Sequence, residues 1–223
     1  MRRRRHLPEI GPVGLAQVLT AVAGLVDAAA YLALGGVFVA NQTGNSVLLA
    51  IAIAERLPLG DSLPGPDRSV SQPLTSLLAF CVGAAAAGWF DSRVLGRLPA
   101  RWPPLLVAEA LLLAAAAAVP GPDQARVGLA AAAMGVQSVH GMRLGINGVP
   151  TTVVTSTLTR LLGRISEKSG QGRSTRLALV WLLYMAGAII GAAGVGLWSF
   201  TTICLCAAAT TGLVAAVRRP RSG

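Results

Sequence analysis

The chain has 223 residues, of which 53% are hydrophobic and 13% are charged, and its mean hydropathy is +0.62. Soluble domains usually carry about 25% charged residues, so this composition predicts an all-α, polytopic membrane protein with one integral membrane domain over residues 1–223. In a soluble protein the net charge of +10 would suggest nucleic acid as a partner. Here the arginines gather in loops and at the termini, where they set membrane topology, so we expect the lipid bilayer as partner and no nucleic acid.

The first apolar segment, residues 13–34, follows a basic cluster at residues 2–5. It is too long for the apolar region of a signal peptide and contains Asp27, so we expect an uncleaved spanning helix with a cytoplasmic N-terminus. Several further apolar stretches approach the ~20 residues that a spanning helix needs. In chain order, these spans are expected at residues 74–90, 104–119, 127–142, 177–198 and 199–217.

A polar stretch, Asn-Gln-Thr-Gly-Asn at residues 41–45, interrupts an apolar segment at about residues 36–55. Lipid cannot satisfy its amides and hydroxyls, so the segment must face protein or a water-filled cavity. A second polar stretch follows about half a chain later. The side chains expected to line a cavity are Asn41, Gln42, Thr43 and Asn45 in the first stretch and Thr152, Thr155 and Thr157 in the second.

The basic loops decide between a spanning and a re-entrant first polar segment. If residues 36–55 crossed the membrane, the loop with Arg93, Arg97 and Arg101 would lie outside, against the positive-inside rule. If the segment enters and leaves on the outer side, every basic loop and both termini are cytoplasmic, and the near-neutral loop 56–73 is outside. We therefore predict six transmembrane helices plus two re-entrant or broken segments.

Each half of the chain, about residues 13–119 and 126–217, then contains one span, one polar segment and two spans. The halves have opposite orientation, which makes a 3+3 inverted repeat of the kind found in secondary transporters. A shift of 112 residues places Thr43 on Thr155, although so biased a composition gives such matches by chance. The order of the segments is the better argument for the repeat.

Small residues also predict closely packed helices. Gly187 and Gly191 form a small-xxx-small pattern, and Gly83 and Gly88 flank four alanines. Such faces let helix backbones approach each other in a membrane. We expect these contacts to hold helices of the two halves together.

Three stretches of the chain resemble the YoaK-like family of bacterial multi-spanning membrane proteins. They are Gly-Leu-Val-Asp at residues 24–27, Leu-Gly-Gly-Val-Phe-Val-Ala-Asn-Gln-Thr-Gly-Asn at 34–45 and Thr-Thr-Val-Val-Thr-Ser-Thr-Leu-Thr at 151–159. The resemblance covers nearly the whole chain and is most specific at residues 41–45. It implies a protein of about this size in the bacterial cytoplasmic (inner) membrane, and it implies no activity.

Ionisable residues inside the expected spans are candidates for function. Asp27 lies about 21 Å into the first helix, where a carboxylate needs a partner, a proton or water. It either binds a solute or proton, or caps free amides of residues 35–45, and both interpretations stay open. His140 lies at a comparable depth, and Glu109 either pairs with it to relay protons or never meets it. Gln137, one turn before His140, is expected to line the same cavity.

The sequence contains no nucleotide-binding loop, metal constellation or nucleophile–base pair, so we expect neither an enzyme nor a cofactor. We predict a transporter or channel for a small polar or anionic solute or ion, with the pathway between the two inverted halves. The alternative is a non-transporting membrane protein that binds another protein or lipid. The substrate and the oligomeric state stay open, a homo-oligomer included. The candidate substrate-binding residues are Asp27, Asn41, Gln42, Thr43, Asn45, Gln137, His140, Thr152, Thr155 and Thr157.

Overall fold

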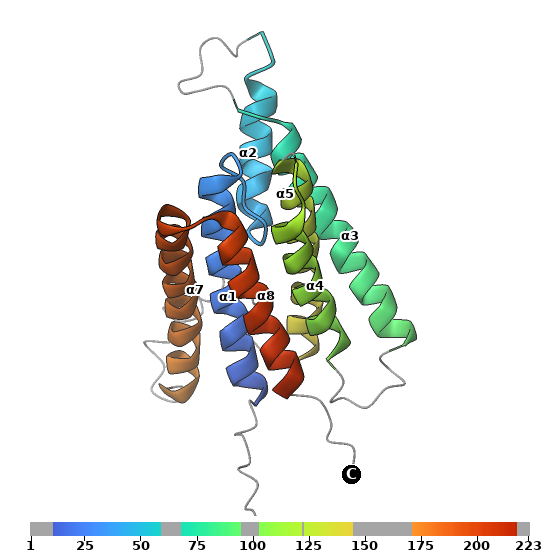
Figure 1. The fold of residues 1–223 in the computed structure, drawn as a ribbon, viewed down its shortest axis with the longest axis vertical. Coiled ribbons are helices and arrows are strands. Elements are labelled where there is room, and N and C mark those ends of the chain that lie inside the picture. The colour runs from blue at the N-terminus through green and yellow to red at the C-terminus, as the bar shows by residue number, and fades with distance from the viewer. Residues whose placement is uncertain (1–10, 59–67, 95–102, 122, 145–170, 218–223) are drawn as a thin grey trace, which may run out of the picture.

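The computed structural model describes residues 11–58, 68–94, 103–121, 123–144 and 171–217, and their regular secondary structure is entirely α-helical (Figure 1). Pro12 and Pro104 each stand in the first turn of a helix, where a missing N–H costs nothing. The helices are α1 (Pro12–Ala33), α2 (Gln42–Ala54), α3 (Ser71–Arg93), α4 (Pro104–Ala118), α5 (Asp123–Arg143), α7 (Gln171–Leu197) and α8 (Phe200–Val217).

A helix occupies each of the six predicted spans, but only four of the described helical segments are long and apolar enough to cross a membrane. α4 is apolar but has 15 residues, and α5 is not among the four. α5 packs against both α3 and α4, so much of its surface meets protein and needs less hydropathy. The four segments are Pro12–Ala33, Ser71–Arg93, Ala178–Leu197 and Phe200–Val217.

The first polar segment turns back into the bundle. α1 is followed by Gly35 and Gly36 with φ of 80° and 75°, a left-handed conformation that glycine adopts without strain. The chain then returns beside α1, and α2 leads out of the bundle at the end where α3 begins (Figure 1). This geometry is the one expected of a segment that enters and leaves on one side.

Two pairs of helices are joined by glycines at backbone contact distance. In the pair α1/α7, a Cβ atom at Gly24 would overlap with the carbonyl oxygen of Tyr184, and one at Gly187 would overlap with that of Ala21. Gly191 meets α1 in the same way. The predicted close packing of Gly187 and Gly191 is therefore present.

The pair α3/α5 repeats this arrangement. A Cβ atom at Gly83 would overlap with the carbonyl oxygen of Ala132, and one at Gly135 would overlap with that of Phe80. The prediction was wrong for Gly88, because no described atom within 4 Å would meet a Cβ there. Its position one helical turn and a half beyond Gly83 takes it off the contact face.

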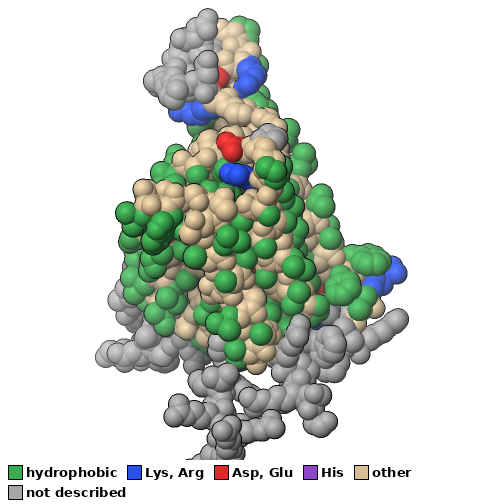
Figure 2. All heavy atoms as spheres, viewed as in Figure 1, with side chains coloured by type: hydrophobic (Ala, Val, Ile, Leu, Met, Phe, Trp, Pro, Cys, Tyr) green, Lys and Arg blue, Asp and Glu red, His purple; other side chains and the backbone are tan. Residues whose placement is uncertain are grey.

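The outer surface of the bundle suits lipid. Large hydrophobic side chains are exposed along α3 and α7, among them Val82 at 67% and Ile189 at 64%. Figure 2 shows hydrophobic side chains spread over the visible side of the bundle, with the visible charged side chains near its two ends. A bilayer would cover the apolar belt and leave the charges in water.

Candidate functional site

The buried carboxylate of Asp27, 2% exposed, holds the start of the polar segment. Its Oδ1 atom accepts hydrogen bonds from the N–H groups of Val39 at 2.8 Å and Ala40 at 2.7 Å, and a longer one from Asn41 at 3.4 Å. Its Oδ2 atom accepts the hydroxyl proton of Tyr184 on α7 at 2.7 Å. Both oxygens are thus bound within the protein.

These contacts explain why a carboxylate sits inside the first helix. Val39 and Ala40 precede the N-cap Asn41 of α2, so their N–H groups have no partner within a helix and need an acceptor in an apolar interior. Asp27 precedes the end of α1 by six residues, so its bonds place the start of α2 about 9 Å inside the bundle. These are the hydrogen bonds that the capping interpretation of Asp27 predicts.

Asn45, fully buried, holds the backbone of Phe38. Its Oδ1 atom accepts the N–H of Phe38 at 2.9 Å, and its Nδ2 donates to the carbonyl of Phe38 at 2.7 Å. Nδ2 also lies 2.9 Å from the Oγ of Ser76 on α3 and 3.0 Å from Oε1 of Gln42. The amide of Asn45 therefore replaces the hydrogen bonds that lipid cannot offer to the turn.

The other candidates of this segment divide into two groups. Asn41 caps α2 by accepting the N–H of Gly44 at 3.1 Å, and Gln42 donates to the carbonyl of Val39 at 2.8 Å. Thr43, in contrast, is exposed on α2. The structure thus brings Asp27, Asn41, Gln42 and Asn45 around one turn and leaves Thr43 outside it.

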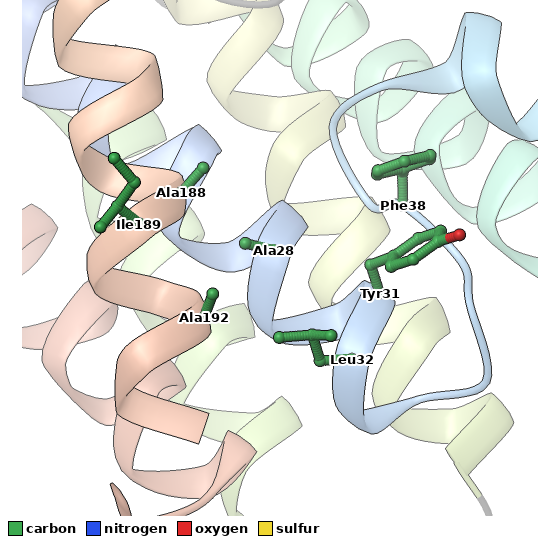
Figure 3. A pocket seen from close by; sticks show the side chains of 7 residues that line it. All are labelled: Ala28, Tyr31, Leu32, Phe38, Ala188, Ile189 and Ala192. Atoms are coloured by element: carbon green, nitrogen blue, oxygen red, sulfur yellow. The ribbon is translucent and has the colours of Figure 1, made fainter. Parts of the chain in front are cut away.

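An apolar groove of about 370 Å³ lies beside this turn (Figure 3). The ring of Phe38 stacks on Tyr31 with 4.9 Å between centroids. Apart from the Tyr31 hydroxyl, which Figure 3 shows directed away from α7, hydrocarbon lines the groove, so it suits an acyl chain better than the predicted polar or anionic solute. The lining residues are Ala28, Tyr31, Leu32, Phe38, Ala188, Ile189 and Ala192.

A second group of polar side chains lies in the bundle interior. Glu109 and Gln137 are fully buried, and His140 is 8% exposed. Glu109 accepts a hydrogen bond from the hydroxyl of Thr211 on α8 at 3.2 Å, so among the described contacts its partner is Thr211 and not His140. Gln137 donates through Nε2 to the carbonyl of Leu19 at 2.8 Å.

The remaining predicted residues, Thr152, Thr155 and Thr157, lie outside the described residues. Two polar residues that sequence reasoning missed are Tyr184 and Ser76, which complete the network around the turn. Tyr184 is one of two tyrosines in the chain and stands in an apolar span. A hydroxyl there needs a buried hydrogen-bond partner, so the sequence could have indicated its role. Ser76 gives none, because a serine in such a helix usually bonds to its own backbone.

Charged pairs stand at opposite ends of the bundle. Beyond α2, Glu55 accepts the N–H of Arg68 at 2.9 Å and forms an ion pair with its guanidinium. This backbone hydrogen bond, together with the charge of Arg68, lowers the pKa of Glu55 below its usual value. Arg143 pairs with Asp91 at 2.9 Å at the other end. The polar turn lies between these charged layers.

Comparison with known proteins places the chain among membrane proteins. A family described as "Protein of unknown function (DUF1275)" matches residues 15–217. The chain is 35% identical over 190 residues to the UPF0700 transmembrane protein YoaK of Bacillus subtilis (strain 168), which covers 79% of this chain and 80% of that protein. No solved structure matches. The predicted resemblance is confirmed, and the chain belongs to the DUF1275 family of proteins of unknown function.

Proposed function

We propose that the protein is a transporter or channel for a small polar or anionic solute or ion, built from two inverted halves in a bacterial cytoplasmic membrane. The observation that carries this proposal is the correspondence between the two glycine-joined helix pairs. A protein built twice on one plan, in opposite directions, is typical of secondary transporters. We take both termini to be cytoplasmic, as the basic loops indicate.

The correspondence extends to individual residues of the helices α1 and α5. Gly24 corresponds to Gly135 and Ala21 to Ala132, each 111 residues later, and each alanine offers its carbonyl oxygen to a glycine of the partner helix. A register shared by both contacts is a stronger sign of a repeat than the similarity of the sequences.

In the partner helices α3 and α7, the contact residues also correspond at one constant offset. Gly83 corresponds to Gly187 and Phe80 to Tyr184, each 104 residues later. In Figure 1, α1 and α5 run in opposite directions, as do α3 and α7 and also α4 and α8. The same contacts in reversed helices support an inverted repeat over residues 13–119 and 126–217.

The halves interlock, which changes where a pathway is expected. α1 of the first half is joined to α7 of the second, and α5 of the second half to α3 of the first. We therefore place the pathway between the pairs α1/α7 and α3/α5, and not between the sequence halves. Gln137 of α5, bonded to Leu19 of α1, lies at this junction.

The alternative, a non-transporting protein that binds another protein or lipid, also has an observation in its favour. The described polar turn binds its own scaffold, since both oxygens of Asp27 are occupied. The groove beside the turn is lined by hydrocarbon. Under this alternative, the polar segment is a device for folding.

Solute flux through the purified protein in liposomes distinguishes the two functions. The proposal expects faster passage of at least one small ion or polar solute than in protein-free liposomes. Gln137→Leu replaces the polar amide at the junction by an aliphatic group, so it should slow that passage. Folded protein that carries none of a panel of inorganic cations, inorganic anions, amino acids and sugars would support the alternative.

A further inference from the structure

We infer that the bundle interior contains a binding site for a small cation, either a proton or a monovalent metal ion, with the Glu109 carboxylate as its charged ligand. Glu109 is fully buried on α4. Its Oε1 accepts a hydrogen bond from Thr211, whereas its Oε2 has no hydrogen-bond partner among the described residues. A buried carboxylate without a counter-charge costs several kcal/mol, so a positive species in contact with it is expected.

A second orphaned oxygen belongs to Gln137 on α5. Its Nε2 is occupied by the carbonyl of Leu19, and its buried Oε1 has no partner within the described part of the chain. The unmatched atoms of Glu109 and Gln137 are thus both acceptors. A cation or a hydrogen-bond donor satisfies such atoms, and an anion does not.

Both side chains border one aliphatic layer. Glu109 follows Leu106 by three residues on α4, so the two share a helix face, and Gln137 is bound to the backbone of Leu19 on α1. Thr211 likewise precedes Val214 by three residues on α8. Leu19, Leu106 and Val214 belong to one buried cluster. The two orphaned oxygens therefore flank hydrocarbon, which cannot satisfy them, so the compensation for the Glu109 charge has to come from a bound positive species.

Both arginines on the neighbouring helix α5 are engaged elsewhere. α4 packs against α5 and α8. Arg126 donates to the carbonyl of Val119, and Arg143 pairs with Asp91. Thr211 is the one described residue that hydrogen-bonds to the Glu109 carboxylate. The titratable or charged groups on these two helices are Asp123, Arg126, His140 and Arg143 on α5 and Cys204 and Cys206 on α8.

The inference deepens the proposed function, because such an ion would be its coupling ion or its solute. It can nevertheless be tested without transport. We would measure the unfolding temperature of the purified protein in sodium, potassium and choline chloride at one pH and ionic strength. At a saturating concentration, sodium or potassium should raise the unfolding temperature by about 5 °C or more above its value in choline chloride. Glu109→Gln should abolish this difference.

If the bound species is a proton, the metal ions should have no effect, and lowering the pH should stabilise the wild type more than Glu109→Gln. Glu55→Gln, which removes the same charge outside the bundle, should keep the ion response of the wild type and should still be stabilised by low pH. Should Glu109→Gln fail to fold, Gln137→Leu should weaken the ion effect instead. Equal ion and pH responses in the wild type and both interior variants would overturn the inference. If the protein binds an ion but carries no solute, the inferred cation site is still supported and the proposed transport function is contradicted.

Discussion

At the scale of single residues, the polar segment is held by side chains whose hydrogen bonds replace water. Asp27 binds the N–H groups of Val39 and Ala40 in the turn before α2, and Asn45 binds both backbone groups of Phe38. Inside a membrane each unsatisfied backbone group would cost several kcal/mol. Within residues 41–45, Asn41, Gln42 and Asn45 therefore supply the hydrogen bonds that this turn requires.

The link between Asp27 and Tyr184 should contribute measurably to stability. Tyr184→Phe removes one hydrogen bond to a carboxylate and should lower the free energy of unfolding by about 1.5–3 kcal/mol. Tyr31→Phe, at a ring that is 43% exposed, should change it little. Denaturation of both variants in detergent tests this, and the same small change for both would contradict the role of Tyr184.

Replacement by aspartate, which has the same shape but carries a charge, should lower the free energy of unfolding far more at Asn45 than at Asn41. Asn45→Asp replaces the donor Nδ2, which binds the carbonyl of Phe38 and the hydroxyl of Ser76, by a second acceptor. We expect a loss of at least about 3 kcal/mol or no folded protein. Asn41→Asp keeps the acceptor at the N-cap of α2 and should cost less than about 0.5 kcal/mol.

The yield and unfolding temperature of these two asparagine variants decide the matter. Equal tolerance of Asn45→Asp and Asn41→Asp would mean that the turn does not depend on the hydrogen bonds of Asn45.

At the scale of helices, glycines set which pairs come into backbone contact. Gly24 and Gly187 let α1 meet α7, and Gly83 and Gly135 let α3 meet α5. Without a hydrophobic driving force between helices in lipid, such close contacts are a main source of helix association. The two pairs are therefore the firmest units of the described bundle.

Alanine substitutions compare contact glycines with matched open positions on the same helices. Gly187→Ala and Gly83→Ala should each cost about 1–3 kcal/mol, because a Cβ overlaps with a carbonyl oxygen of the partner helix. Gly196→Ala on α7 and Gly88→Ala on α3 would bring a Cβ within 4 Å of no described atom, and they should be neutral or stabilise by up to about 1 kcal/mol.

Thermal unfolding in detergent gives these four values. The inverted repeat further requires similar costs for Gly187→Ala and Gly83→Ala. A contact glycine that tolerates alanine as well as Gly88 does would refute the tight pairing of that helix.

The helices were predictable from the sequence, whereas the partners of the polar residues were not. The apolar stretches located both ends of α1, α3, α4 and α8 to within three residues, whereas α7 begins six residues before its predicted start. Asp27 could be located but not assigned, since both interpretations place it beside residues 35–45, and its partner Tyr184 is 157 residues away. The contact of Gly88 was mispredicted because spacing alone does not show which face of a helix meets a partner.

At the scale of the whole molecule, the helix ends of the described bundle fall into two groups, one at each end of the bundle. Figure 1 places the start of α1 and the end of α8 at one end, and the exit of α2 and the turn between α4 and α5 at the other. This agrees with the sidedness deduced from the basic loops. The charge rule assigns the end with the termini to the cytoplasm.

Membrane-impermeant thiol labelling tests this sidedness in a variant whose three cysteines have been replaced. A cysteine at Ser69 or Gly121 should react from outside intact cells, and one at Arg93 should react only after permeabilisation. Labelling of Arg93→Cys from outside intact cells, with Ser69→Cys labelled only after permeabilisation, would mean that residues 36–55 span the membrane, and the re-entrant segment would be wrong.

The most direct test of inverted-repeat transport compares solute flux through liposomes that contain Thr43→Leu or Thr155→Leu. The sequence predicts that both threonines line the pathway, and the repeat makes Thr155 the counterpart of Thr43, so both variants should slow flux by a similar factor even though Thr43 lies outside the polar turn. Thr210→Leu, at an exposed α8 residue whose hydroxyl bonds to its own helix, should leave flux unchanged. Flux that is absent from the wild type, or that is slowed no more by Thr43→Leu and Thr155→Leu than by Thr210→Leu, would contradict the account.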